Sequence, residues 1–467
     1  MATESYNVLV IGSGGGSKII RPAANLGLSV CLIEKGPFGG TCLNSGCIPS
    51  KMLIHPADII STIEGANCFE IQVSTPSIDK HKLVDRVCQE IDAESASIGP
   101  LYDKSKVKVH RGACHFVSSR CVEVNGILVT ADYIFVVAGC RAKVPDIPGL
   151  LGTPYITYSA ALRLKETPKT AIVIGGGYIA VELGYFFAKT GTKVDFLVRS
   201  KLLATLDDTV GQVFRSDFSK SHSIHLEAVP INVSYDGMFH VTVQFPNEQK
   251  VMTCDCLFVA AGVQSQTDLL RMHEHGYQVD NIGLLKVDGA FRTSVKNVWA
   301  FGDIIGNPMF RHTANYQGEW VFKNVFKNPT HSIDDVYDKS QSVISYPPIP
   351  FAVFTNPQIG GVGLTEKEAI AAYSKLVIGV SEYQDIAMGN ACLVKSGICK
   401  LIFKASDHVL VGAHIIGPEA STLIHMLIAY MRCNATLEII LDTIFIHPAF
   451  GELIRDAARD ARDNLNH

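Results

Sequence analysis

Two cysteines stand five positions apart in a glycine-rich segment, and this pair is the strongest chemical signal in the chain. Cys42 and Cys47 lie in the stretch GGTCLNSGCIPSK at residues 39–51. Four intervening residues allow the two sulfur atoms to meet across one helical turn, so a disulfide is sterically possible. If a helix begins here, Pro49 suits its first turn, and the positive end of that helix would lower the pKa of a thiol. Such a pair can alternate between disulfide and dithiol, which is redox chemistry.

Two other interpretations of this pair remain open, namely a metal site and two unrelated core thiols. Structural zinc usually takes cysteines two to four residues apart, together with a second pair elsewhere. The other close pair, Cys254 and Cys256, lies in the apolar stretch CDCLFVA. Alternation along one strand would put both of these side chains on the same face, and we interpret them as core residues. We therefore expect no metal site.

A second candidate for chemistry is a histidine followed by a carboxylate. His447 and Glu452 lie five positions apart in IHPAFGE. Most isolated histidines are structural groups, whereas a histidine oriented by a carboxylate suits proton transfer near neutral pH. The residues alone leave both interpretations open.

The elements that would position these groups begin with two glycine turns. The apolar run YNVLVI ends at Gly12, which allows a tight turn, and Gly14 would let the backbone approach a pyrophosphate at the following helix N-terminus. Glu34 ends the next apolar run, where a carboxylate can accept hydrogen bonds from a ribose hydroxyl. Ser17 replaces the third glycine of this pattern. The pattern predicts a nucleotide-binding βαβ unit.

The second turn repeats this signature with a different ending. The run AIVI leads into Gly175 and Gly177, and the following run, VDFLVR, ends at Arg199 with Lys201 close behind. Basic groups at this point would attract a 2′-phosphate that an acid would repel, which favours NADP over NAD. The alternative is a solvated basic loop. Two such units in one chain imply two nucleotide ligands.

Composition excludes several classes of function. The chain has 467 residues, with 41 Lys plus Arg and 45 Asp plus Glu, so its formal net charge is −4. It therefore has no general electrostatic attraction for nucleic acid or anionic membranes. No apolar run reaches the length of a membrane span, and the first residues lack the basic region of a signal peptide. We expect a cytoplasmic protein with neither a nucleic-acid nor a membrane partner.

The stretch GGTCLNSGCIPSK closely resembles the redox-active disulfide of the pyridine nucleotide–disulfide oxidoreductases, flavoproteins such as dihydrolipoyl dehydrogenase, glutathione reductase and mycothione reductase. The resemblance runs along almost the whole chain through VWAFGD, RHTA, FTNPQI, VGLTE and GAHIIGPE. It implies an α/β fold with two Rossmann-like domains, for FAD and NAD(P), and a C-terminal α+β dimerisation domain. We predict an FAD domain with the redox disulfide, an NAD(P) domain, a segment completing the FAD domain and a dimer-interface domain, at residues 1–149, 150–264, 265–344 and 345–467.

The resemblance also assigns roles to residues. Cys47 would be the sulfur nearest the flavin and Cys42 the thiol that exchanges with substrate. His447, held by Glu452, would be the acid and base, reaching the disulfide of the other subunit. Lys51 would lie near the flavin in an ion pair with Glu182, and Tyr178 would gate the nicotinamide pocket. The predicted cofactor-binding residues are Gly12, Gly14, Gly16, Glu34, Gly40, Thr41, Lys51, Gly139, Gly175, Gly177, Tyr178, Glu182, Arg199, Gly262, Gly302, Asp303, His312, Thr313 and Ala314.

The substrate and the direction of electron flow stay open in the sequence. The chain is most like dihydrolipoyl dehydrogenase, which delivers electrons to NAD. The alternative is an NADPH-dependent reductase of a small disulfide, like mycothione or glutathione reductase. A second alternative is a flavin-binding protein with a decayed site, because the sequence departs from the family pattern at Ser17, Pro22, Ala138 and Val263. We expect a homodimer with a shared active site and a small thiol, disulfide or lipoyl substrate.

Overall fold

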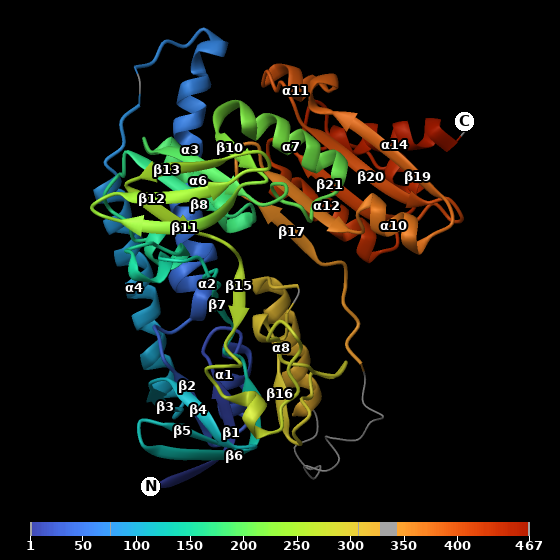
Figure 1. The fold of residues 1–467 in the computed structure, drawn as a ribbon. Helices are drawn as coiled ribbons and strands as arrows, with labels where there is room; N and C mark the ends of the chain where they lie inside the picture. Colours follow the sequence, from blue (N-terminus) through green and yellow to red (C-terminus); the bar gives the residue numbers. More distant parts are fainter. Residues whose placement is uncertain (1, 75, 307, 327–342, 466–467) are drawn as a thin grey trace. The chain divides into compact units, whose positions relative to one another are not determined.

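The computed structural model describes residues 2–74, 76–306, 308–326 and 343–465 (Figure 1). The described residues fall into two compact units. The first unit takes its residues from Met1–Ser50, Leu83–Val144 and Gly262–Ser345. The second takes them from Lys51–Lys82, Pro145–Ala261 and Tyr346–His467. The four-part division of the chain stays a prediction, since these units group residues 145–261 with residues 346–467.

A mixed sheet forms the core of the first unit. Strand β1 (Thr3–Ile11) lies between β2 (Val30–Glu34) and β6 (Ile127–Val136) and is parallel to both. Its consecutive residues Val8, Leu9 and Val10 are fully buried, which explains why the apolar run does not alternate with polar residues. The other strands of the sheet are β3 (Lys108–Arg111), β4 (Cys114–Ser118), β5 (Cys121–Val124) and β16 (Val298–Ala300).

Helices and a small ribbon complete this unit. Helix α1 (Ser17–Asn25) follows β1 directly and contacts α8 (Arg311–Val325). Strand β7 (Cys140–Ala142) pairs in the antiparallel sense with β15 (Val263–Ser265). The remaining helices of this part of the chain are α2 (Gly40–Ser45), α3 (Cys47–Gly65) and α4 (Lys80–Lys104), of which α3 and α4 also extend into the second unit.

The second unit contains a parallel sheet with the order β10-β9-β8-β14. Its strands are β8 (Thr170–Ile174), β9 (Lys193–Val198), β10 (Ser223–Leu226) and β14 (Cys256–Val259), connected in part by α6 (Tyr178–Lys189) and α7 (Asp208–Ser221). An antiparallel ribbon is formed by β11 (Val229–Tyr235), β12 (Phe239–Gln244) and β13 (Gln249–Cys254), and α5 (Tyr158–Ala161) precedes β8.

The structure both confirms and corrects the interpretation of the second cysteine pair. Cys254 and Cys256 are buried, with 1% and 8% of their surface exposed, so they belong to the core as predicted. They do not share one strand, however. Cys254 ends β13 and Cys256 begins β14, because the chain passes from the ribbon into the parallel sheet at Asp255.

A five-stranded antiparallel sheet forms the C-terminal part of the second unit, in the order β17-β18-β21-β20-β19. Its strands are β17 (Pro350–Val353), β18 (Ile359–Gly363), β19 (Leu376–Glu382), β20 (Ile398–Lys404) and β21 (Leu410–Ile416). The helices are α10 (Glu366–Ala372), α11 (Ala387–Ala391), α12 (Ala420–Arg432), α13 (Leu437–Asp442) and α14 (Glu452–Leu465). Helix α14 lies against β19 and β20 (Figure 1). The predicted α/β class is therefore confirmed, and no helix among the described residues is long and apolar enough to span a membrane.

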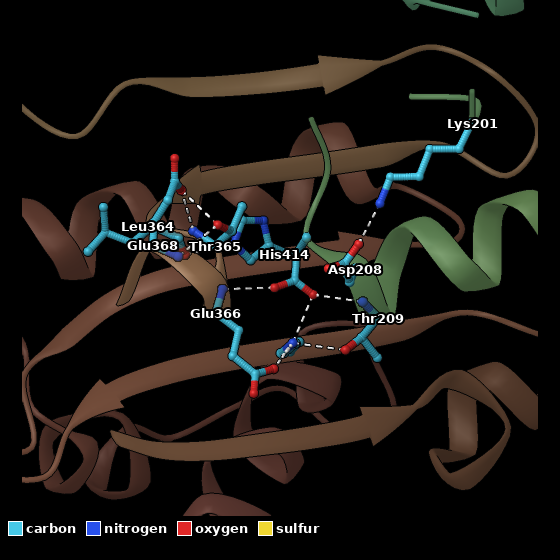
Figure 2. A network of polar contacts seen from close by, with 10 residues as sticks. Lys201, Asp208, Thr209, Leu364, Thr365, Glu366, Glu368 and His414 are labelled. Atoms are coloured by element: carbon cyan, nitrogen blue, oxygen red, sulfur yellow. Dashed lines mark hydrogen bonds and ion pairs between the residues drawn. The ribbon is translucent and has the colours of Figure 1, made fainter. Parts of the chain in front are cut away.

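A buried lysine joins the two sheets of the second unit. Lys400 of β20 has 2% of its side chain exposed, and its Nζ lies 2.8 Å from Asp207 Oδ1 and 2.6 Å from Glu366 Oε2. It also donates to Thr209 Oγ1 at 2.8 Å, so all three ammonium protons have acceptors. Figure 2 shows Thr209 and Glu366 in this network, with His414 beside it donating from Nε2 to the Leu364 carbonyl oxygen.

Asp207 is the centre of this network because it also caps a helix. Its Oδ1 accepts from the Thr209 N–H at 3.1 Å at the start of α7, and its Oδ2 accepts from the Glu366 N–H at 3.0 Å. Burial opposes the ionisation of Asp207, but hydrogen bonds from Lys400 and from the Glu366 backbone outweigh it and lower its pKa. The ion pair is therefore desolvated and fully hydrogen-bonded.

We predict that Lys400→Met destabilises the protein by about 3–5 kcal/mol, because removing one partner of a buried pair leaves an uncompensated charge. Urea denaturation followed by circular dichroism measures the effect. Lys404→Met is the control, since Lys404 pairs with Asp407 at the surface, where such a pair contributes at most about 1 kcal/mol. Equal losses in the two variants would contradict the prediction. The stabilisation that ionised Asp207 provides is present above its unfolded pKa and is lost as pH falls through its lowered folded pKa. The difference in unfolding free energy between the Lys400→Met and Lys404→Met variants should therefore shrink in acid.

Candidate functional site

The two cysteines of the predicted redox pair meet at the junction of two helices. Cys42 lies in α2 and Cys47 is the first residue of α3, with Pro49 in the first turn as predicted. Both are thiols in this structure. The Cys42 thiol donates a hydrogen bond to Cys47, and this bond, together with burial and the charge on Cys47, raises the pKa of Cys42. The two free thiols therefore lie within hydrogen-bonding reach of each other, and the redox role stays a prediction.

The first glycine turn brings the cysteine helix close to the predicted nucleotide site. Gly12 has a φ of +103°, and a Cβ atom there would lie 2.5 Å from the Val137 carbonyl oxygen. A Cβ on Gly40, whose φ is +68°, would lie 2.6 Å from Gly14 Cα. Only glycine fits this close approach of two backbones. No described side chain caps the N-terminus of α1 or α2, and the first three N–H groups of α1 donate to the carbonyl oxygens of Gly14, Gly15 and Gly16.

Glu34 faces this turn but is already held by the protein. Its Oε2 accepts from the N–H and the hydroxyl of Ser13, at 2.8 and 2.6 Å, and its Oε1 accepts from the Gly36 N–H at 2.8 Å. The Ser13 hydroxyl in turn accepts from the Gly39 N–H at 3.0 Å. Sequence reasoning missed Ser13, which is buried between the glycines of the motif and fixes the carboxylate. That Glu34 binds a ribose hydroxyl stays a prediction.

Further polar groups of the first unit gather where the second FAD motif is predicted. Gly302, with a φ of +75°, precedes Asp303, and burial raises the pKa of the Asp303 carboxyl although Arg311 opposes the shift. Thr313 is buried in the first turn of α8, and its hydroxyl oxygen has no hydrogen-bond partner among the described residues. His312 stacks on Phe310. The other residues predicted here are Gly16 at the start of α1, Thr41 in α2, Gly139 after β6 and Ala314 in α8.

These residues fit a cofactor that carries several polar groups, such as FAD. The buried Thr313 hydroxyl has no hydrogen-bond partner among the described residues, and the half-buried Asp303 carboxylate lies in the field of Arg311. Cys140, which sequence reasoning missed, donates its thiol to the Asp303 carbonyl oxygen at 3.2 Å and so helps to fix the motif. Residues 12–16, 40–41, 302–303 and 312–314 would hold the group.

The second glycine turn lies between β8 and α6. Gly175 is tightly packed, since a Cβ there would lie 2.2 Å from the Ala260 carbonyl oxygen, while Gly177 precedes the uncapped N-terminus of α6, which begins at Tyr178. At the end of β9, Arg199 is exposed and makes no hydrogen bond or ion pair with any described residue. Gly262, after β14, has a φ of +105° and belongs to the first unit. The turn can receive a pyrophosphate, which stays a prediction.

The predicted ion pair of Lys51 and Glu182 is present. Lys51 Nζ lies 2.7 Å from Glu182 Oε2, and it also lies 4.5 Å from the centre of the Phe354 ring. The other oxygen of Glu182 accepts from the Phe354 N–H at 2.9 Å. Glu182 is therefore saturated on both oxygens and holds Lys51 in one place. The position of Lys51 beside a flavin stays a prediction.

The structure also brings the histidine and the carboxylate together. His447 Nδ1 lies 3.0 Å from each oxygen of Glu452, whose side chain is 3% exposed. Glu452 accepts further hydrogen bonds from the Ala449 N–H at 3.2 Å and from Arg455 at 2.8 Å. Burial opposes its ionisation, but the hydrogen bonds from His447, Ala449 and Arg455 outweigh burial and lower the pKa of Glu452. With Nδ1 engaged and the His447 side chain 69% exposed, Nε2 can exchange a proton with another molecule.

The candidate residues are divided between the two units. The cysteine pair and the first glycine turn belong to the first unit, while Lys51, Glu182, His447 and Glu452 belong to the second. Among the residues that the structure describes, no group of three or more His, Cys, Asp or Glu side chains could hold a metal ion.

We predict that Gly40→Ala lowers the flavin content of the purified protein about tenfold, because its Cβ would collide with Gly14 backbone and its φ is unfavourable by about 1–2 kcal/mol. Visible absorbance of the flavin relative to protein measures the content. Gly36→Ala is the matched control, since a Cβ there would meet only the Glu34 carboxylate, at an ordinary 3.7 Å. If Gly40→Ala retained the wild-type flavin content, the close approach would not be required for binding.

Comparison with known proteins agrees with this arrangement. Residues 6–318 match the family described as pyridine nucleotide-disulphide oxidoreductase, and residues 349–458 match the dimerisation domain of that family. The chain is 31% identical to a dihydrolipoyl dehydrogenase of Chlorobaculum tepidum, covering 98% of each chain. It is 32% identical to a mycothione reductase of Mycobacterium tuberculosis, covering 97% of this chain and 99% of the relative.

A solved structure is also similar. It is the Cu(II) complex of a cysteine-to-serine mutant of an HOCl-induced flavoprotein disulfide reductase from Escherichia coli. The TM-score is 0.82 at 25% identity, and the match covers 98% of this chain and 99% of that one. The chain therefore belongs to the pyridine nucleotide-disulphide oxidoreductase family and is a flavoprotein disulfide oxidoreductase that uses FAD and NAD(P)H.

Proposed function

We propose that this enzyme takes electrons from NADPH and reduces a small disulfide. The observation that carries the proposal is the end of β9, where Arg199 stands in place of an acid, is exposed and has no partner among the described residues. A guanidinium there attracts a 2′-phosphate, whereas a carboxylate would repel it. The similarity to mycothione reductase supports the same choice.

The nucleotide would bind along the second glycine turn. The uncapped N–H groups at the start of α6 would receive the pyrophosphate, and Tyr178, the first residue of that helix, would cover the nicotinamide pocket. FAD, when bound, would supply two-electron transfer between the nicotinamide and the cysteine pair. Lys51, fixed by Glu182, would contribute a positive charge on the path between them.

The thiol chemistry would begin at Cys42. A thiol must lose its proton before it can attack, and Nε2 of His447 would accept the proton of Cys42. The Cys42 sulfur would then attack one sulfur of the substrate disulfide, forming a mixed disulfide, and His447 would return the proton to the first leaving thiolate. Cys47 would then lose its own proton and attack the Cys42 sulfur, which breaks the mixed disulfide, and that second proton would go to the second leaving thiolate. The cysteine pair loses two electrons and becomes a disulfide, and the substrate gains both.

The histidine would come from the partner subunit of a homodimer. The match of residues 349–458 to the dimerisation domain supports dimer formation. The residues around His447 support a contact with the partner subunit at this place. Ile444 and Ile446 are 97% and 80% exposed in the single chain, which is unusual for large apolar side chains so close together. A dimer would cover them and carry His447 and Glu452 to the cysteine pair of the partner. Because this chemistry needs reduced thiols, the cytoplasm would be its compartment.

A second candidate function is the oxidation of a dihydrolipoyl group with NAD. The similarity to dihydrolipoyl dehydrogenase over nearly the whole chain favours it. The same residues would act in the reverse order, with His447 taking a proton from the dithiol substrate. A flavin-binding protein with a decayed site is the least favoured alternative, because the cysteine pair and the His447–Glu452 dyad are both intact.

We predict that NADPH reduces the flavin about tenfold faster than NADH at equal low concentration, because charge-assisted hydrogen bonds to a 2′-phosphate contribute about 1.5–3 kcal/mol. Anaerobic stopped-flow absorbance of the flavin measures both rates. Faster reduction by NADH would favour the dihydrolipoyl reaction instead, and a flavin that neither nucleotide reduces would indicate a decayed site.

We predict that Cys47→Ser retains the flavin but loses disulfide turnover, because Cys42 and Cys47 can no longer form a disulfide.

We predict that His447→Ala slows turnover about a hundredfold or more, the usual contribution of a general acid and base, while NADPH still reduces the flavin at the wild-type rate. Steady-state turnover and stopped-flow reduction on the same preparations measure both steps. Slow flavin reduction in His447→Ala would contradict the proposed role of this histidine in thiol–disulfide exchange, because it would show that His447 acts in the reduction of the flavin.

A further inference from the structure

The loop between β9 and α7 is fastened to the nucleotide-binding turn. The Leu203 N–H donates to the Gly176 carbonyl oxygen at 2.7 Å, and Arg215 of α7 donates to the Leu202 carbonyl oxygen at 3.3 Å. The end of the second strand of a nucleotide-binding βαβ unit is where the adenosine ribose lies. The charged residues of this loop therefore stand at the predicted position of the ribose 2′ group.

Two cations, Arg199 and Lys201, and one carboxylate, Asp208, lie at the predicted position of the ribose 2′ group. Lys201 Nζ lies 2.8 Å from Asp208 Oδ1, while Arg199 has no partner among the described residues. The side chains of Lys201 and Asp208 are 43% and 71% exposed, so a ligand can reach both. The hydrogen bond and charge of Lys201 lower the pKa of Asp208, so the carboxylate is ionised at neutral pH.

The backbone of Asp208 is held in place because the residue before it is buried. Asp208 is the first residue of α7, directly after Asp207, which caps the helix and pairs with the buried Lys400. Figure 2 shows Lys201 and Asp208 at the edge of this network, with Thr209 and Glu366 beside them. The C-terminal sheet thus fixes the start of α7, and the start of α7 fixes the partner of Lys201.

A 2′-phosphate that approached Lys201 would meet this carboxylate. The phosphate would have to replace Asp208 as the partner of Lys201 and would be repelled by the remaining negative charge. A nucleotide with a 2′-hydroxyl meets no such repulsion. We propose that Asp208 is a specificity-determining residue, which occupies Lys201 and so restrains the preference for NADP that Arg199 would otherwise set. This inference rests on the proposed use of NADPH.

The test compares two ligands that differ only in the 2′-phosphate, 2′,5′-ADP and 5′-AMP, by isothermal titration calorimetry on the flavin-loaded enzyme. Asp208→Asn should tighten the binding of 2′,5′-ADP about fivefold, the upper range for an exposed ion pair, and should leave 5′-AMP unchanged. The gain should shrink at high salt. The double variant Asp208→Asn with Lys201→Gln should lose the gain, because no freed ammonium group remains.

Asp407→Asn is the matched control. It removes the same charge from an exposed pair in the same unit, where Asp407 lies 2.6 Å from Lys404. It should change neither affinity. An equal gain in Asp407→Asn, or equal tightening of both ligands in Asp208→Asn, would reduce the effect to net charge and overturn the inference.

The outcomes separate the two proposals. If the wild-type enzyme prefers 2′,5′-ADP but Asp208→Asn leaves that preference unchanged, the role of Asp208 is wrong and the use of NADPH stands. If 2′,5′-ADP binds no better than 5′-AMP in the wild type and in every variant, both the role of Asp208 and the use of NADPH are wrong. Stopped-flow reduction of the flavin by NADPH and NADH then shows whether the enzyme still accepts either nucleotide.

Discussion

The close contact between the backbones at Gly14 and Gly40 is the constraint on which the first unit depends. A Cβ atom on Gly40 would lie 2.6 Å from Gly14 Cα, so the turn after β1 and the start of α2 touch without side chains between them. Cys42 follows two residues after Gly40. The contact therefore ties the position of the thiol pair to the position of the nucleotide-binding turn. Side chains at this junction would move the cysteine pair away from the predicted nucleotide turn.

Hydrogen-bonded carboxylates hold the remaining parts of the site, of which Glu182 and Glu452 are buried and Glu34 is half-buried. Glu34 accepts from Ser13 and Gly36, Glu182 accepts from Lys51 and the Phe354 N–H, and Glu452 accepts from His447, Ala449 and Arg455. A buried carboxylate with several donors keeps its charge and its orientation. Each carboxylate can then hold a more exposed group, such as Lys51 or His447, in the place where it can act. In the pairs Lys51–Glu182 and His447–Glu452, the more exposed residue would take part in the chemistry, and the buried carboxylate orients it.

The C-terminal sheet would have a part in the proposed nucleotide binding, and its match to the dimerisation domain supports a part in dimer formation. Lys400 reaches from that sheet to Asp207, and the next residue, Asp208, pairs with the lysine of the nucleotide loop. The same domain carries His447 on its exposed side. The second unit thus carries both the loop that is proposed to bind the nucleotide and the His447–Glu452 dyad.

The sequence by itself determined the parts of this protein that depend on near neighbours in the chain. The cysteine pair, the glycine turns and the His447–Glu452 dyad could be predicted because each is set by a spacing of a few residues, and local backbone geometry follows from such spacing. Tertiary structure decided the partners that lie far apart in the chain. Ser13 meets Glu34, Cys140 meets the Asp303 carbonyl and Lys400 meets Asp207 only because strands and helices pack in a particular register. The nucleotide loop shows the difference most clearly. The sequence places Arg199 and Lys201 together as two cations, but packing of α7 against the C-terminal sheet brings Asp208 to Lys201 and neutralises one of them, and no local pattern contains that contact.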